Sequence, residues 1–80
     1  MKAQEKITID YIVYYPGDEV PDLGSWLAIK ANEQGYREYI GFSDDVSKLP
    51  HYVAHGSSAF CLDTGDYYKY HKQTDIWYKL

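Results

Sequence analysis

The sequence GSSAFCLDTGDYYKYHKQTDIWYKL, residues 56–80, decides the fold class of this chain. Its apolar and aromatic runs, residues 60–62, 67–71 and 76–80, are separated by Asp63-Thr64-Gly65 and by Lys72-Gln73-Thr74-Asp75. The short carboxylate of Asp63 can accept hydrogen bonds from backbone amides that follow it, and Gly65 can adopt a positive φ at no steric cost. We therefore expect two tight reversals that join three short strands into a β-meander.

Alternation along these strands distributes their side chains over two faces. In the second strand Tyr68 and Tyr70 share the face opposite Tyr67, and in the third Trp77 lies opposite Tyr78. Alternation alone leaves open which of the two faces is buried.

The first half of the chain predicts three further strands. Residues 7–15, ITIDYIVYY, are rich in β-branched and aromatic side chains and predict one long strand. Residues 25–31 and 36–42 have the spacing of a hairpin, with Gly35 at the loop position that favours a positive φ. Residues 25–34 also have helix-compatible propensities, but ten residues between glycines make a poor isolated helix, so a strand is preferred.

Two irregular connections are expected between these strands. Residues 16–24, PGDEVPDLG, contain two prolines and three acidic residues and predict a loop. Within residues 43–56, Ser43 or Asp44 can cap a single helical turn, which Pro50 ends.

These segments predict one all-β domain over residues 1–80, a small antiparallel sheet or partly open barrel of five to six strands that ends in the meander. Residues 1–6 are largely polar and are expected to form a flexible tail. A chain of 80 residues encloses only a small core, and its one cysteine excludes an internal disulfide. Oligomerisation is therefore the expected source of additional stability.

The charge balance weighs against nucleic-acid and membrane partners. The net charge is −4 and no basic run exists, whereas nucleic-acid binding relies on clustered lysine and arginine. No apolar stretch reaches the length of a membrane span, and the N-terminus lacks the apolar segment of a signal peptide. We therefore expect synthesis in a cytoplasm, where Cys61 stays reduced.

Ten tyrosines and two tryptophans make the chain unusually aromatic. Tyrosine offers a large contact area with a polar tip, which suits a surface that is buried on assembly, although β-sheets also favour tyrosine for packing alone. Exposed aromatic rings can instead stack on sugars, or Trp26 and Trp77 can simply fill the core. The candidate partner-binding residues are Tyr11, Tyr14, Tyr15, Tyr67, Tyr68, Tyr70, Trp77 and Tyr78.

Two motifs allow a catalytic or metal-binding interpretation. Asp63-Thr64-Gly65 matches the aspartic-protease signature, but only 15 residues follow it, too few for a substrate cleft, so a hairpin turn is preferred. His51 and His55 have the spacing of zinc ligands on a helix, but Pro50 and Gly56 disfavour a helix there and no glutamate lies between the histidines.

The remaining nucleophiles also favour structural roles. Cys61 lies between Phe60 and Leu62 inside a predicted strand, where cysteine acts as a small apolar filler. Ser57 and Ser58 lack the Gly-x-Ser-x-Gly elbow of hydrolases. No catalytic, metal-binding or cofactor-binding residue is therefore predicted, and we expect no enzymatic activity.

Six short motifs in residues 39–80 together resemble small virion structural proteins of phages and prophages of Gram-positive bacteria. The motifs are Gly41-Phe42-Ser43, Leu49-Pro50, Gly56-Ser57-Ser58, Asp63-Thr64-Gly65, Tyr68-Lys69-Tyr70 and Trp77. The resemblance implies a noncatalytic, capsid-associated or tail-associated protein with no catalytic residues to carry over.

The resemblance and the small aromatic domain together predict a capsid decoration or head-fibre protein, present in many copies. The expected partners are other virion structural proteins, such as the major capsid protein, and further copies of the chain. The expected location is the virion, after assembly in the bacterial cytoplasm. The alternative is a carbohydrate-binding module of a tail or cell-surface assembly, which uses exposed aromatic rings.

Overall fold

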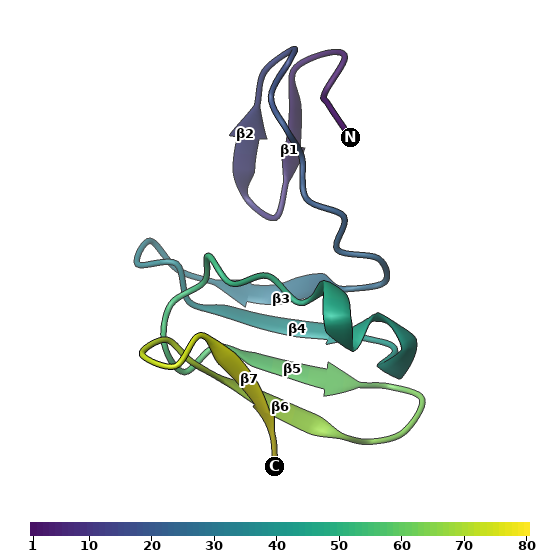
Figure 1. Ribbon diagram of the computed structural model, residues 1–80, viewed down its shortest axis with the longest axis vertical. Coiled ribbons are helices and arrows are strands. Elements are labelled where there is room, and N and C mark those ends of the chain that lie inside the picture. The colour runs from purple at the N-terminus through teal and green to yellow at the C-terminus, as the bar shows by residue number, and fades with distance from the viewer.

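Five strands form one sheet in the spatial order β3-β4-β5-β6-β7, and two more form a separate hairpin (Figure 1). The computed structural model describes residues 1–80. The hairpin consists of β1 (Ile7–Ile9) and β2 (Ile12–Tyr14). The sheet consists of β3 (Leu27–Ala31), β4 (Arg37–Gly41), β5 (Ser58–Cys61), β6 (Tyr67–His71) and β7 (Ile76–Lys79). The prediction of an all-β chain is therefore confirmed.

The predicted meander is also confirmed. β5, β6 and β7 are successive antiparallel neighbours, with Phe60 opposite Tyr67 at the first pairing. Gly65 has a φ of +78°, and its amide donates a hydrogen bond to the carbonyl of Cys61 at 2.8 Å. The left-handed conformation that glycine tolerates thus closes the β5–β6 turn, as the sequence predicts.

The predicted hairpin of residues 25–42 forms as well. β3 and β4 pair in antiparallel fashion, and Gly35 in their loop has a φ of +95°. The side-chain oxygen of Asn32 accepts two amide hydrogen bonds within the loop, each at 3.0 Å. The register shifts between Ala28 and Lys30, so β3 carries a bulge near its middle. The helical alternative for this segment is not adopted.

β4 and β5 pair in parallel, with Tyr39 opposite Ala59. The sheet is therefore mixed, whereas the sequence led us to expect antiparallel pairing throughout. A parallel connection needs a crossover of about a dozen residues or more, and residues 42–57 supply it. β3 and β7 each have a single strand neighbour, so the sheet is open and does not close into a barrel.

The crossover contains the 3-10 helix η1 (Ser43–Lys48), at the predicted helical turn. The predicted cap is wrong, because the N-cap position is Phe42 and no side chain caps the helix. Ser43 instead donates hydrogen bonds from its amide and its hydroxyl to Asp63, at 2.9 and 2.6 Å. The Asp63 carboxylate therefore joins η1 to the β5–β6 turn, and its main hydrogen bonds come from Ser43 and not, as we had expected, from the amides that follow it. No helix in the structure combines the length and apolar character needed to cross a membrane.

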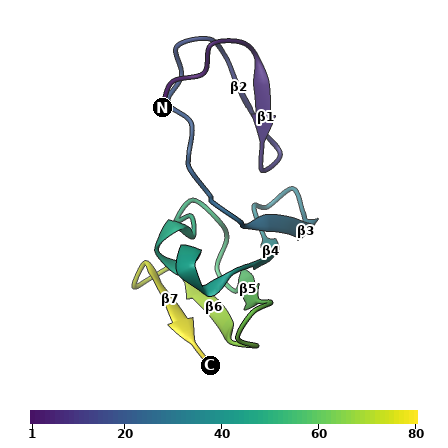
Figure 2. The same cartoon turned by 90° about the vertical axis from the view of Figure 1, so that its right-hand side faces the viewer.

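The prediction of one long strand over residues 7–15 is wrong. The segment folds back on itself, with Ile9 opposite Ile12 across a two-residue turn. The turn residues, Asp10 and Tyr11, have φ of +52° and +66°, as a type I′ hairpin requires. Aspartate tolerates this region better than most residues. Figures 1 and 2 show that the hairpin stands away from the sheet, with its turn toward β3 and β4.

The N-terminal residues run beside the chain that follows β2. Lys2 forms a bridge with Glu19, and the amide of Ala3 donates to the carbonyl of Asp18 at 2.9 Å. Ala3 and Val20 are buried. The expected flexibility of residues 1–6 stays a prediction. Motion of this segment would break the contacts of Lys2 and Ala3 with the chain after β2.

One face of the sheet, which we call the inner face, carries the core. η1 and the loop after it lie over this face (Figure 2). Val46 of η1 packs against the core. Gly41 is needed there, because a Cβ at this position would lie 2.5 Å from Cε3 of Trp26. The core residues are Trp26, Tyr39, Leu49, Val53, Ala59, Cys61 and Tyr70.

Candidate functional site

A row of apolar side chains crosses the opposite face of the sheet, which we call the outer face. Strand register places its members side by side on β3, β4, β5, β6 and just after β7, in the order Leu27, Ile40, Phe60, Tyr67 and Leu80. The exposed fractions are 68% for Leu27, 36% for Phe60, 38% for Tyr67 and 75% for Leu80. The row therefore presents large apolar groups to solvent across the whole sheet.

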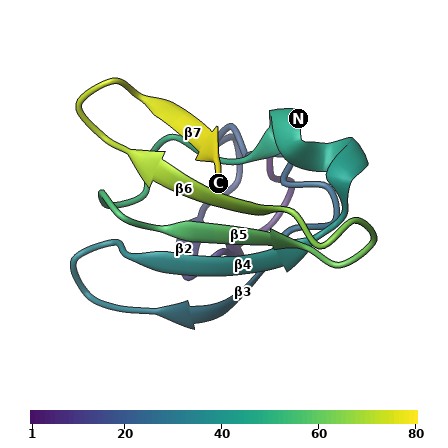
Figure 3. The same cartoon turned by 90° about the horizontal axis from the view of Figure 1, so that it is seen from below.

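No element of the chain covers this face. Figure 3 views it directly, with η1 and the N-terminal hairpin behind the five strands. Phe42 and Leu62, which continue the alternation of β4 and β5, are 49% and 53% exposed. Contiguous exposed apolar surface on a small protein is typical of a site of interaction, so we take the outer face as the candidate functional site.

A second, polar row lies beside the apolar one. Its members, again in strand order, are Lys30, Glu38, Ser58, Lys69 and Tyr78. The carboxylate of Glu38 lies 4.0 Å from the Lys30 ammonium, and the Lys69 ammonium donates to a backbone carbonyl at 3.1 Å. The outer face thus has an apolar band and a charged band, with the acidic and basic groups on different strands.

Glu38 also organises the aromatic side chain beside it. The hydroxyl of Tyr36 donates to the Glu38 carboxylate at 2.9 Å. Partial burial, followed by this hydrogen bond, raises the pKa of Tyr36. This hydrogen bond links the Glu38 carboxylate to an aromatic side chain of the same face.

The eight predicted partner-binding residues do not form one surface. Tyr67 and Tyr78 lie on the outer face, and Tyr78 is 45% exposed. Tyr68, Tyr70 and Trp77 lie on the inner face with the core, as the shared pairing positions require. Tyr70 is only 1% exposed and therefore offers almost no surface to a partner, so its assignment as a contact residue stays a prediction that the structure does not favour.

The other three predicted residues belong to the N-terminal hairpin. Tyr11 and Tyr15 are 64% and 56% exposed, whereas Tyr14 is partly buried. Burial raises the pKa of the Tyr14 hydroxyl, with a smaller effect from the nearby carboxylates. Tyr11 and Tyr15 remain candidates for a separate contact surface, away from the outer face.

Sequence reasoning missed Leu27, Ile40, Phe60 and Leu80 as members of the site. Each shows the alternation of a strand, which is the signal that could have found it. Their alignment depends on the parallel register of β4 with β5, which alternation within a strand does not reveal.

A buried carboxylate joins the N-terminal hairpin to the sheet. The hydroxyls of Tyr39 and Tyr52 each donate to Asp10 Oδ2 at 2.5 Å. Arg37 Nε lies 3.4 Å from Asp10 Oδ1, within ion-pair distance but outside hydrogen-bonding geometry. Burial, then the bond to Asp10, raises the pKa of both tyrosines. Asp10 was not predicted, although it is the one charged residue in the apolar run of residues 7–15.

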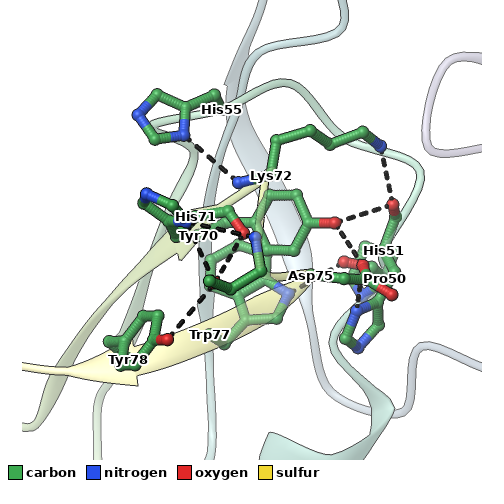
Figure 4. Close-up of polar contacts among 10 residues, drawn as sticks. Pro50, His51, His55, Tyr70, His71, Lys72, Asp75, Trp77 and Tyr78 are labelled. Carbon is green, nitrogen blue, oxygen red and sulfur yellow. Dashed lines mark hydrogen bonds and ion pairs between the residues drawn. The ribbon is translucent and has the colours of Figure 1, made fainter.

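The three histidines lie around the β6–β7 turn (Figure 4). His51 Nδ1 is 2.8 Å from Asp75, His71 Nδ1 is 2.9 Å from the Thr74 hydroxyl, and His55 accepts the amide hydrogen of Lys72 at 3.2 Å. His51 and His55 are not on a helix. Their contacts hold the loop after η1 against the turn.

Asp75 lies at the centre of this contact. It accepts a hydrogen bond from the hydroxyl of Tyr70, and that bond, with the one to His51, lowers the pKa of Asp75. Burial, followed by the same bond, raises the pKa of Tyr70 to about 12. Beside Tyr70, the indole of Trp77 donates to the carbonyl of Pro50 at 2.8 Å. Tyr70 and Trp77 therefore act as structural side chains of the core.

The surroundings of Asp63 and Cys61 favour structural roles for both side chains. The hydrogen bonds from Ser43 lower the pKa of Asp63, and burial raises the pKa of the Cys61 thiol. A low carboxyl pKa keeps Asp63 ionised as an acceptor, and a raised thiol pKa disfavours the reactive thiolate.

A groove of about 550 Å³ lies where the N-terminal hairpin approaches β3. Its walls come from residues 8–11 of the hairpin, residues 21–24 of the following loop and residues 26–28 at the start of β3. β3 is an edge strand whose single strand neighbour is β4, so the groove lies close to an edge of the sheet.

A scan against protein-family models, a search of curated proteins and a search of solved structures each found no match to this chain.

Proposed function

We propose that this chain is a noncatalytic structural protein of a phage or prophage virion, associated with the capsid and present in many copies. The observation that supports this proposal is the outer face, on which the exposed side chains of Leu27, Phe60, Tyr67 and Leu80 and the partly buried side chain of Ile40 form an apolar row across five strands. Burial of such a row against another protein surface stabilises an assembly by roughly 25 cal/mol per Å² of apolar area. The function is therefore assembly through the outer face.

The shape and composition of the face suit a protein partner. Aromatic and aliphatic groups at its centre, with charged groups along one side, have the arrangement of a protein–protein interface with an apolar middle and a polar rim. Phe60 and Tyr67 are adjacent on neighbouring strands, with ring centroids 6.2 Å apart. Large, rigid side chains of this kind provide most of the binding energy in such interfaces.

Carbohydrate binding is less well supported. Of the two tryptophans, Trp26 is 2% exposed and Trp77 packs against the core from the inner face. The side chains best suited to stack on sugar rings are thus already engaged in packing.

The test of this proposal is the location of the chain in particles. Particles of a phage whose genome encodes the chain are purified on a density gradient, separated into heads and tails, and analysed by quantitative mass spectrometry. We expect many copies in the head fraction. Absence from particles would contradict the proposal, and presence only in tails would contradict the association with the capsid.

Two matched variants connect that location with the outer face. Phe60→Asp places a charge in the apolar row, and Val13→Asp makes the same kind of change on the N-terminal hairpin, where Val13 is 44% exposed. We expect Phe60→Asp to be folded by circular dichroism but depleted from particles, and Val13→Asp to be incorporated normally. The reverse pattern would assign assembly to the hairpin.

A further inference from the structure

We propose that the outer face binds the outer face of a second copy of this chain, about a two-fold axis that runs parallel to β5. This inference rests on the proposed assembly function and names the partner of the same site. A two-fold axis in this direction keeps each residue at its level along the strands and exchanges the two sides of the sheet. β3 of one copy then faces β7 of the other, β4 faces β6, and β5 faces itself.

This arrangement pairs apolar groups with apolar groups. Because Leu27, Ile40, Phe60, Tyr67 and Leu80 share one level, Leu27 faces Leu80 of the second copy and Ile40 faces Tyr67. Phe60, on the central strand, faces its own equivalent near the axis. The whole row is thus buried against itself.

The same operation pairs the charged groups. Glu38 on β4 and Lys69 on β6 lie at one level, on either side of Ser58 of β5. The two-fold axis therefore brings Glu38 of each copy opposite Lys69 of the other, and Lys30 opposite the ring of Tyr78. A two-fold axis perpendicular to the strands, at the level of Ile40 and Phe60, would place Glu38 of one copy opposite the apolar side chains at the level of Phe42 and Leu62 of the other. The charge pattern therefore favours the axis parallel to β5.

The geometry of sheet packing allows these contacts. Aligned sheets pack about 10 Å apart with strands inclined by about 30°. Neighbouring strands are about 4.8 Å apart, so the inclination displaces Glu38 from Lys69 of the second copy by roughly 2 to 3 Å. Long glutamate and lysine side chains span that offset.

The size of the face sets the expected affinity. Five strands of about five residues cover roughly 24 by 17 Å, or about 400 Å² for each copy. Stable complexes bury about 800 Å² for each partner, so this dimer belongs to the small and weakly associating class. We therefore expect a dissociation constant in the micromolar to millimolar range.

Sedimentation equilibrium of the full chain, from about 10 μM to about 1 mM, measures the association. The variants are Glu38→Lys, Lys69→Glu and the double variant Glu38→Lys/Lys69→Glu. The controls are Glu5→Lys and Lys6→Glu, which make the same changes in charge at exposed positions of the N-terminal segment. Circular dichroism confirms that each variant is folded.

We expect each single reversal to raise the dissociation constant by about tenfold or more, because the symmetry places two like-charged pairs in each dimer. The double reversal restores opposite charges and is expected to return the constant to within about threefold of the original. The controls should leave it unchanged. A monomer at all concentrations, single reversals no worse than the controls, or a double variant that stays weak would each overturn the proposal.

The location experiment distinguishes this inference from the proposed function. A chain that is monomeric in solution but abundant in heads would refute the two-fold dimer and leave the function intact. A dimer with the predicted charge dependence that is absent from particles would refute the function and leave the dimer intact.

Discussion

Removal of the Asp10 carboxylate should destabilise the whole domain. The Asp10 side chain is 2% exposed, and the Arg37 side chain beside it is 8% exposed. Asp10→Ala leaves the guanidinium buried without its counter-charge and removes the acceptor of the Tyr39 and Tyr52 hydroxyls. Breaking a buried ion pair by removing one partner costs about 3–5 kcal/mol. A domain of this length has an unfolding free energy of about 4–12 kcal/mol, so the expected loss is a large fraction of the total.

Urea unfolding, followed by tryptophan fluorescence, measures this loss, because Trp26 and Trp77 both pack in or against the core of the sheet. Tyr52→Phe removes one hydrogen bond to a charged acceptor from a side chain that is 41% exposed, and should cost about 1 kcal/mol. Asp44→Ala changes an exposed aspartate and should have little effect.

A second substitution separates the buried charge from the lost hydrogen bonds. In Asp10→Ala/Arg37→Met the unpaired guanidinium is also removed, so part of the stability should return. Hydrogen exchange of residues 1–20 reports whether the hairpin separates from the sheet before global unfolding. If Asp10→Ala unfolds at the same urea concentration as Asp44→Ala, the buried carboxylate does not hold the hairpin and the reasoning is refuted.

Three further predictions concern the sheet and its turns. Burial, followed by the hydrogen bond to Asp75, raises the pKa of Tyr70 to about 12. The contribution of this group to stability is therefore fully present below pH 10 and is lost as the pH rises through about 12. Tyr70→Phe should make the alkaline decrease in unfolding free energy shallower. Gly41→Ala should cost about 1–3 kcal/mol by overpacking, because its Cβ would meet the Trp26 ring; an unchanged near-ultraviolet circular dichroism spectrum and an unchanged midpoint would contradict this. The hydrogen bonds of Ser43 lower the pKa of Asp63. Their contribution to the unfolding free energy is therefore present above the ordinary aspartate pKa and is lost as the pH falls through the lowered pKa. Asp63→Asn should show a shallower loss of stability on acid titration, and an acid transition identical to that of the unchanged chain would show that the contact contributes nothing.

The sequence by itself determined the strands and turns that depend on neighbouring residues. The meander and the β3–β4 hairpin follow from short apolar runs separated by residues suited to tight turns, and Gly35 and Gly65 have the positive φ that those turns need. Alternation along β6 also predicted that Tyr68 and Tyr70 lie on the opposite face of the sheet from Tyr67. Each of these features is decided within a few residues of chain, where steric preferences act directly.

Tertiary structure alone decided which strands become neighbours and which face is covered. Nothing local in residues 42–57 specifies that β5 returns parallel to β4, yet this pairing aligns Ile40 with Phe60 and so builds the outer face. The reversal at Asp10 likewise needs Tyr39 and Tyr52, which are distant in sequence, to hold its carboxylate. Burial of Tyr70 and Trp77 on the inner face depends on the crossover that packs over them. These features arise from contacts between remote segments, whose free energy exists only once the chain has folded.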